Sequence, residues 1–496
     1  MIGQPSVPVG SPGEPGIRHH RRLFLGGEWA EPSSPDNLDV IEAHTQRVVG
    51  RVPVAGRADV DRAVASARAA FERSGWPQAP VSERIDAVRR IIVRFTERFE
   101  EMARTISSEN GAPIKFSRLG QVGAPLDIME SMVDLAGRTP WEERRTGRHA
   151  DYLVRREPVG VVGAIVAWNV PQVLIAVKLV PALLAGCTVV VKAAPEASLD
   201  AMLLAEIVEA AALPAGTVSV LTGGTDVGRA LVEHPGVDKI AFTGSTSAGQ
   251  DIAARCGAAL KRVSLELGGK SAAVVLDDAD LETTANGLRY ASFVNNGQAC
   301  AAQTRILAPR ARYEEIVGMV AGVADGLTVG DPLDPDNRIG PLVSERQRDR
   351  VRRYIELGSE EGARLVAGGP APPPGQPVGW FVQPTVFAEV DNRMRIAQEE
   401  IFGPVLCVIP YDDDADAVRV ANDSSYGLAG SVWTSDTERG LDIARSVRTG
   451  TFGINGYAPD TLAPFGGYKK SGIGREWGAA GLDEYVELKA INGVGG

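Results

Sequence analysis

The sequence predicts an α/β fold with two doubly wound domains and a small additional β element. The chain has 496 residues, which is too long for a single hydrophobic core. From residue 159 onward, short apolar runs alternate with helical segments, as they do in a parallel sheet covered by helices on both faces. A second alternating series begins at residue 271 and continues to about residue 455. We therefore expect two sheets, one after the other along the chain.

The N-terminal part of the chain contains a tail and then helices. Residues 1–16 are rich in proline and glycine and lack the charged start and apolar block of a secretory signal, so we predict a disordered tail over residues 1–20. Residues 57–110 carry apolar side chains at helical spacing.

The first sheet is expected from five apolar runs, "VGVVGAIVAW", "CTVVVKAA", "TVSVLTG", "KIAFTG" and "RVSLELGG". Their spacing is typical of a dinucleotide-binding sheet. We assign residues 21–137 and 159–268 to a cofactor-binding domain.

The second series predicts a second α/β domain over residues 269–481, with helices near 312–326, 344–361, 414–422 and 437–447. The proline-rich stretch 370–379 is expected to be a surface loop within it. Two further segments, 149–160 and 484–493, alternate as edge strands do and need a partner sheet. We assign residues 138–158 and 482–496 to an oligomerisation element and expect a homodimer or homotetramer.

Composition narrows the function. A net charge of −11 argues against binding nucleic acid or an anionic membrane as the main task, and there is no run of 18 apolar residues. The four cysteines form no CxxC motif and no cluster with histidine, which fits a reducing cytoplasm and argues against disulfides and a metal site.

Three residues are candidates for chemistry, although each has a plainer explanation. Cys300, in "NNGQACAAQTRIL", could be a buried apolar residue rather than a nucleophile. Asn169, after the first apolar run, could be a turn or cap residue. Glu266, at the end of the fifth run, could be an ion-paired core residue, but carboxylates are rarely buried without a function.

Two glycine-rich turns, 244–249 and 223–228, lie between these candidates. Glycine and hydroxyl residues between a strand and a helix let the backbone approach a phosphate, which the helix N-terminus favours. Neither turn has the GxGxxG spacing, so an ordinary strand-to-helix turn remains an alternative.

Seven motifs occur together and in order: "AWNVP", "FTGSTSAG", "LELGGKS", "GQACAAQTR", "QEEIFGPV", "YGLAGSVWT" and "PFGGYKKSGIGRE". With them the sequence resembles the aldehyde dehydrogenase superfamily of NAD(P)-dependent, hydrolytic enzymes, from about residue 24 to residue 490. The resemblance implies an aldehyde-dehydrogenase-like fold with a Rossmann-like cofactor domain, a catalytic domain and a small β oligomerisation element.

The resemblance also implies a role for each candidate. Cys300 would be the nucleophile, and Asn169 with the Cys300 backbone N–H would form the oxyanion hole. Glu266 would be the general base for the water that hydrolyses the thioester. The family activates its thiol by local dipoles and by Glu266 through water, so no histidine is needed. Lys178 and Glu476 match positions that relay protons from that base.

NAD is the cofactor that the resemblance implies, with NADP possible. The family's acidic residue stands three positions after the lysine, but here "KAAPE" has Pro195 there and Glu196 one position later. A carboxylate near the ribose repels a 2′-phosphate, so Glu196 still favours NAD. The matching cofactor positions are Ile165, Trp168, Asn169, Lys192, Glu196, Gly228, Phe242, Gly244, Ser245, Gly249, Leu267, Glu400 and Phe402.

The substrate tunnel implied by the resemblance is lined mainly by small aliphatic residues, so we expect an apolar aliphatic or aromatic aldehyde. Recognition of a trimethylammonium group would need several aromatic faces. The expected lining positions are Val170, Leu174, Val177, Ala299, Ala301, Tyr457 and Phe465.

Three alternatives remain open. A cysteine-dependent acyl hydrolase without nicotinamide would explain Cys300, but papain-like enzymes need a histidine downstream, and all five histidines precede Cys300. A CoA-acylating relative would share the thioester but typically lacks the glutamate base. A folded relative without activity would not need Cys300, Asn169 and Glu266 together.

Overall fold

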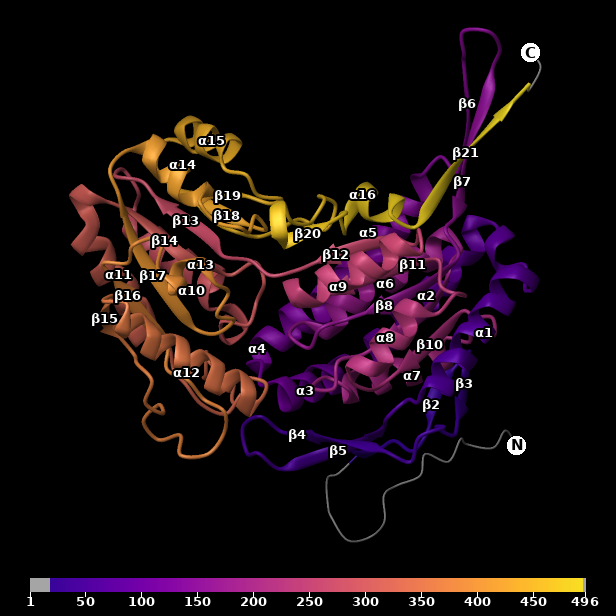
Figure 1. Ribbon diagram of the computed structural model, residues 1–496, viewed down its shortest axis with the longest axis horizontal. Helices are drawn as coiled ribbons and strands as arrows, with labels where there is room; N and C mark the ends of the chain where they lie inside the picture. The colour runs from indigo at the N-terminus through magenta and orange to yellow at the C-terminus, as the bar shows by residue number, and fades with distance from the viewer. Residues whose placement is uncertain (1–17, 494–496) are drawn as a thin grey trace.

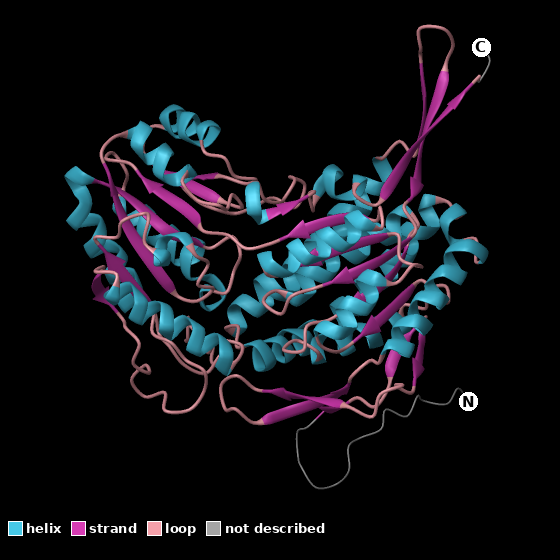
Figure 2. Ribbon diagram, in the orientation of Figure 1, coloured by secondary structure: helices cyan, strands magenta, loops and turns pink. Residues whose placement is uncertain are grey.

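The structure is a computed structural model that describes residues 18–493, and it contains an eight-stranded sheet, a seven-stranded sheet and two three-stranded sheets (Figures 1 and 2). The two large sheets belong to separate halves of the molecule that lie side by side. This arrangement confirms the predicted α/β fold class.

The eight-stranded sheet has the order β20-β12-β11-β8-β9-β10-β2-β3. Its five central strands are parallel and mostly buried, as their short, mainly apolar runs predicted. The outer strands β2, β3 and β20 are antiparallel additions that the sequence analysis did not include. The strands are β2 (Leu23–Leu25), β3 (Glu28–Ala30), β8 (Val161–Ile165), β9 (Thr188–Lys192), β10 (Val218–Leu221), β11 (Lys239–Thr243), β12 (Arg262–Glu266) and β20 (Gly472–Ile473).

Helices cover both faces of this sheet because successive side chains of each strand point to opposite faces. In β9, Val189 and Val191 join one core cluster, whereas Val190 joins another. The first cluster contains α2 (Val81–Glu97), α3 (Phe99–Asn110), α5 (Ala124–Arg138), α6 (Pro171–Ala185) and α7 (Leu199–Ala210). The second contains α1 (Arg57–Arg73), α8 (Thr225–Glu233) and α9 (Thr246–Ala258). Short helical segments in this half are η1 (Trp76–Gln78), α4 (Ile114–Phe116) and the π-helix η2 (Ser117–Gly123).

The seven-stranded sheet has the order β15-β16-β17-β14-β13-β18-β19, and only β15 is antiparallel to its neighbour. Its strands are β13 (Ser271–Val275), β14 (Gln303–Pro309), β15 (Arg364–Ala367), β16 (Thr385–Ala388), β17 (Val405–Tyr411), β18 (Gly430–Trp433) and β19 (Gly453–Ile454). The loop predicted over 370–379 precedes β16 and has no regular secondary structure.

Two groups of helices cover this second sheet, and the four helices predicted from periodicity are among them. Those on one face are α10 (Leu281–Phe293) and α11 (Tyr313–Asp325), and those on the other are α12 (Glu345–Glu360), α13 (Arg395–Gln398), α14 (Asp414–Asn422) and α15 (Thr437–Ser446). Three 3₁₀ segments complete this half: η3 (Val294–Gly297), η4 (Arg310–Arg312) and η5 (Lys469–Ser471).

The two segments predicted as edge strands pair with each other. The strand β7 (Tyr152–Pro158) lies between β6 (Glu142–Arg145) and β21 (Val486–Asn492), and the three form an antiparallel arm that projects from the body (Figure 1). Their partner is thus supplied within the chain, and a role in oligomerisation stays a prediction.

Two assigned boundaries differ from the structure. The predicted tail falls largely on residues 1–17, which lie outside the described residues, but β1 (Arg18–His19) is already paired with β5 (Val48–Pro53), which also pairs with β4 (Asn37–Ile41). Residues 472–481, assigned to the domain over 269–481, return to the other half, because β20 pairs with β12 and α16 (Gly478–Asp483) packs on α5 and α6.

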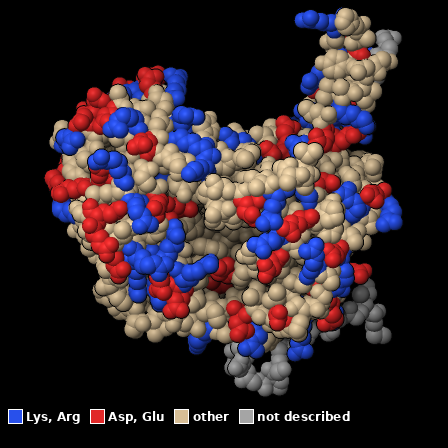
Figure 3. Space-filling view, in the orientation of Figure 1, with Lys and Arg blue, Asp and Glu red and all other residues tan. Residues whose placement is uncertain are grey.

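The visible surface carries acidic and basic side chains intermixed, with a recess between the two halves (Figure 3). Within residues 18–493 no helix is both long and apolar enough to cross a membrane.

Candidate active site

Three strands of the eight-stranded sheet end at the same edge. Ile165 of β8 pairs with Phe242 of β11, and Thr243 pairs with Glu266 of β12. The segments that follow these strands therefore meet at one place, which is where open α/β sheets bind ligands. Asn169 and the 244–249 turn follow two of these ends, and Glu266 is itself the third.

Cys300 reaches this edge from the second half of the molecule. It follows η3, in which Asn295 and Asn296 have φ values of 52° and 60°. Asparagine is one of the few residues that tolerates this left-handed conformation. Cys300 is partly exposed, whereas Cys187, Cys256 and Cys407 are buried, as expected for cysteines packed within the fold.

The surroundings of Cys300 keep its thiol protonated. Burial of the sulfur, together with the negative charges of Glu266 and Glu400, raises the pKa of Cys300 to about 12. A hydrogen bond from the Ala301 backbone N–H acts in the opposite direction. The thiolate is the nucleophilic form, so the cysteine needs a base or a nearby positive charge before it can react.

The side-chain amide of Asn169 uses one of its two hydrogens in a hydrogen bond within the protein. Its Nδ2 donates to the backbone carbonyl of Gln298 at 3.2 Å, two residues before Cys300. An amide nitrogen carries two hydrogens, so the second can bind an oxyanion that forms on a substrate carbon attached to Cys300.

Glu266 is buried in an unusual environment. Its carboxylate lies against Gly466, where a Cβ would come within 2.6 Å of Oε1. Neither carboxylate oxygen has a hydrogen-bond partner among the described residues. Burial and the charge of Glu476 raise the pKa of Glu266 well above its usual range, although Lys178 opposes the shift. A carboxyl group of raised pKa can act as a general base near neutral pH.

Behind Glu266 lies a buried ion pair. Lys178 Nζ is 2.6 Å from Glu476 Oε1 and donates to Thr243 Oγ1 at 2.6 Å. The lysine side chain is fully buried on α6. Sequence analysis named both members of this pair, and the structure brings them together close to Glu266.

The 244–249 turn has the features of a phosphate site. Ser245 is the N-cap of the 13-residue helix α9 and accepts a hydrogen bond from the Ala248 N–H. Within α9, a Cβ at Gly249 would lie 2.5 Å from Leu267, so only glycine allows this close packing of helix and strand end. Free backbone N–H groups at the helix start favour a phosphate. Gly228 in α8 is also buried, and a Cβ there would meet no atom within 4 Å.

Lys192 and Glu196 lie at the end of β9, and the structure adds a residue that the sequence did not indicate. Burial lowers the pKa of Lys192 to about 8, against the effect of Glu196. Arg346 Nη2 lies 3.6 Å from Glu196 Oε1. The arginine belongs to α12, far along the chain, and no local sequence signal links it to "KAAPE".

Glu400 and Phe402 stand at the junction of the two halves. Glu400 accepts a hydrogen bond from the Gly269 N–H at 3.0 Å, and burial raises the pKa of its carboxyl group. The Phe402 ring contacts Trp168 edge-to-face, with centroids 5.4 Å apart. Phe402 has a φ of 63°, and Gln347 donates to its carbonyl oxygen at 2.7 Å. Gln347 is another supporting residue that the sequence analysis missed.

The positions expected to line a substrate tunnel fall into two groups. Leu174 and Val177 are 6% and 1% exposed and belong to the core. The partly exposed positions are Val170, Ala299, Ala301, Tyr457 and Phe465.

The aromatic groups of this lining are tied to other residues. The Tyr457 hydroxyl hydrogen-bonds Thr451 Oγ1 at 2.8 Å, and burial raises the pKa of that phenol. Phe465 stacks on Trp477 with centroids 4.8 Å apart. Trp477 was not predicted.

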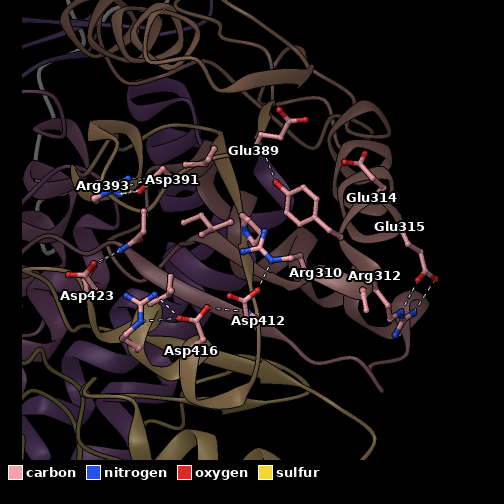
Figure 4. Close-up of a pocket in the computed structure, with 18 residues that line it drawn as sticks. Arg310, Arg312, Glu314, Glu315, Glu389, Asp391, Arg393, Asp412, Asp416 and Asp423 are labelled. Carbon is pink, nitrogen blue, oxygen red and sulfur yellow. Dashed lines mark hydrogen bonds and ion pairs between the residues drawn. The ribbon is translucent and has the colours of Figure 1, made fainter.

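A depression of about 930 Å³, separate from the Cys300 site, lies at the carboxyl ends of β14 and β17. Its arginines point at carboxylates, for example Arg310 at Asp412 and Arg393 at Asp391 (Figure 4). These charges satisfy one another, so the depression offers no free group for chemistry. Nowhere in the described part of the chain do three or more His, Cys, Asp or Glu side chains form a group able to hold a metal ion.

The fold, together with the residues at the ends of β8, β11 and β12, defines a doubly wound α/β protein with a cysteine site between its two large sheets. The chain belongs to the aldehyde dehydrogenase family, whose model matches residues 29–491. It is 48% identical to geranial dehydrogenase from Castellaniella defragrans over 475 residues, which cover 95% of this chain and 98% of that protein.

Two solved structures are also very similar. An aldehyde dehydrogenase from Mycobacterium tuberculosis complexed with NAD+ is 48% identical, with a TM-score of 0.94 and coverage of 96% of this chain and 98% of that chain. A mutant of aldehyde dehydrogenase C from Pseudomonas syringae, complexed with NAD+ and octanal, is 41% identical, with a TM-score of 0.92 and coverage of 95% and 96%.

Proposed function

We propose that this enzyme oxidises an apolar aldehyde to the carboxylic acid with NAD+, through a thiohemiacetal and a thioester on Cys300. The observation that carries the proposal is the meeting of Cys300, Asn169 and Glu266 at one sheet edge. Formation of NADH from NAD+ and aldehyde, followed by absorbance, tests it.

In the first step, the Cys300 thiol gives its proton to solvent water, and the sulfur adds to the aldehyde carbon. The carbonyl oxygen becomes an oxyanion, which accepts hydrogen bonds from the free hydrogen of Asn169 Nδ2 and from the Cys300 backbone N–H. Such preorganised donors contribute about 10²–10³-fold in rate.

The residues around the 244–249 turn fit a dinucleotide. Ser245 and the first N–H groups of α9 would hold the pyrophosphate, Lys192 the adenine ribose, and Glu400 with Phe402 the nicotinamide ribose and ring. The bound nicotinamide supplies the hydride acceptor that converts the thiohemiacetal to the thioester.

Glu266 then removes a proton from the water that attacks the thioester, and the acid leaves as the Cys300 sulfur is released. The proton on Glu266 must reach solvent afterwards. Lys178 and Glu476 lie beside it and provide a route.

Within the family, transfer of the acyl group to CoA is the main alternative to hydrolysis, and the presence of Glu266 supports hydrolysis.

The projecting arm of β6, β7 and β21 supports a homodimer or homotetramer, because Leu488 on β21 is 65% exposed. The four free cysteines are consistent with a cytoplasmic location.

Cofactor preference gives the first prediction. We expect kcat/KM to be higher with NAD+ than with NADP+, because Glu196 repels a 2′-phosphate, while Arg346 partly offsets that repulsion. An exposed pair of this kind is worth at most about 1 kcal/mol, so Arg346→Ala is expected to widen the NAD+ preference by up to about five-fold. Glu196→Gln is expected to narrow it. A wild-type preference for NADP+ would show that Pro195 and Arg346 outweigh Glu196.

Substrate class gives the second prediction. We expect octanal and benzaldehyde to have higher kcat/KM than betaine aldehyde, since each buried methylene contributes about 0.8 kcal/mol and the lining is largely aliphatic. Phe465 and Trp477 stack on each other and so do not form a cage around a cation. The relatives that act on geranial or bind octanal support an apolar substrate. A higher kcat/KM for betaine aldehyde would overturn this proposal.

A further inference from the structure

The main-chain carbonyl of Asn169 is held by side-chain amides from separate elements. Gln121 Nε2 donates to this oxygen at 2.9 Å and Asn295 Nδ2 at 2.8 Å, while Asn110 Nδ2 makes a weaker contact at 3.5 Å. Gln121 belongs to the π-helix η2, a rare conformation that is frequent at functional sites. The backbone that carries the expected oxyanion donor is therefore fixed by buried side chains.

Asn295 has a second connection to the same donor. Its Nδ2 also donates to the Gln298 carbonyl at 3.2 Å, which is the oxygen that accepts the hydrogen bond from Asn169 Nδ2. The two hydrogens of one amide thus hold the Asn169 backbone and the acceptor that orients its side chain.

These contacts have a structural cost. Asn295 adopts a φ of 52°, and within residues 18–493 its Oδ1 is buried without a hydrogen-bond partner. The same is true of Gln121 Oε1. Buried polar atoms without partners and left-handed backbone are unfavourable, and they occur preferentially at functional sites.

We propose that Asn295 and Gln121 are positioning residues for the oxyanion hole, which act on the reaction only through Asn169. This inference rests on the proposed function of Asn169. On this inference, Asn295 of η3 and Gln121 of η2 keep Asn169 in the geometry that the reaction needs, and their main role is not to stabilise the fold.

The test is a double-mutant cycle on the single-turnover rate of NADH formation. Asn295→Asp keeps the size and the tolerance of positive φ but removes both N–H donors, and we expect a loss of about 10²-fold, as for a small misplacement of a catalytic group. In the Asn169→Ala background the same substitution is expected to change the rate less than about three-fold, because the residue on which it acts is gone. Equal losses in both backgrounds would overturn the inference.

Asn296 provides a matched control. It has the same residue type, a φ of 60° and full burial, but its Nδ2 donates to Gly111 and Pro341 carbonyls, at 2.9 Å each. Asn296→Asp should lower thermal stability about as much as Asn295→Asp, with a much smaller loss of single-turnover rate in the folded enzyme. A loss in Asn296→Asp as large as that in Asn295→Asp would show that η3 acts only through its fold.

If Asn295→Asp does not fold, Gln121→Met decides the question by the same cycle, with an expected loss of about 10-fold that disappears in the Asn169→Ala background. Asn169→Ala alone also separates the two proposals. Full activity in that variant would refute the proposed role of Asn169, whereas a large loss with additive cycles would refute only the positioning role of Asn295 and Gln121.

Discussion

Replacement of Cys300 by alanine is expected to lower kcat for NAD+-dependent aldehyde oxidation by at least about 10⁴-fold, because no other group can form the covalent intermediate. NAD+ binding and thermal stability should change little, since Cys300 is partly exposed and its removal leaves no large core cavity. Steady-state NADH formation and NAD+ titration measure the two properties separately.

Cys187, Cys256 and Cys407 provide the controls. Each is buried, so alanine in their place should affect stability more than kcat. Residual activity of the Cys300→Ala variant above about 1% of wild type would refute the assignment of the nucleophile.

Replacement of Glu266 by glutamine is expected to separate the two halves of the reaction. Hydride transfer does not need the general base for water, so one equivalent of NADH should form in a burst. Turnover should then slow by about 10²–10⁴-fold, because general-base catalysis of thioester hydrolysis is lost. Rapid mixing with NADH absorbance resolves the burst from the steady state.

A Glu266→Gln enzyme without an NADH burst would point to a different role for this residue. The charge of Glu266 is one cause of the raised pKa of Cys300, so the Glu266→Gln change should make the thiol easier to ionise. Loss of the burst itself would mean that Glu266 mainly activates the thiol.

The positive charge of Lys178 lowers the pKa of Glu266, against the effect of burial. Lys178→Met removes this charge, so we expect slower deacylation with the NADH burst retained.

The sequence predicted the central sheets because their strands are short, mainly apolar runs that alternate with helical segments. It also predicted a candidate site at one edge of the first sheet. Asn169 and Glu266 stand at ends of parallel strands, and such ends share one edge, so their proximity follows from topology. The role of Cys300 could be assigned only from the family motifs, because a single cysteine in a neutral segment does not by itself indicate a nucleophile.

Features that depend on distant or very short segments could not be predicted. The strand β20 has two residues, which is too few for periodicity to show, so the return of residues 472–481 to the first half was missed. Arg346 reaches Glu196 from another helix, across 150 positions of the sequence. The left-handed backbone of Asn295, which allows it to hold Asn169, has no reliable sign in "VNNG".

The most direct test of the covalent mechanism is to trap the thioester. The Glu266→Gln enzyme is mixed with NAD+ and octanal, quenched in acid and digested, and its peptides are analysed by mass spectrometry. We expect one octanoyl group, attached to the peptide that contains Cys300, in an amount equal to the NADH burst. A burst of NADH with no acyl group on the protein, or an acyl group on a different residue, would contradict catalysis through Cys300.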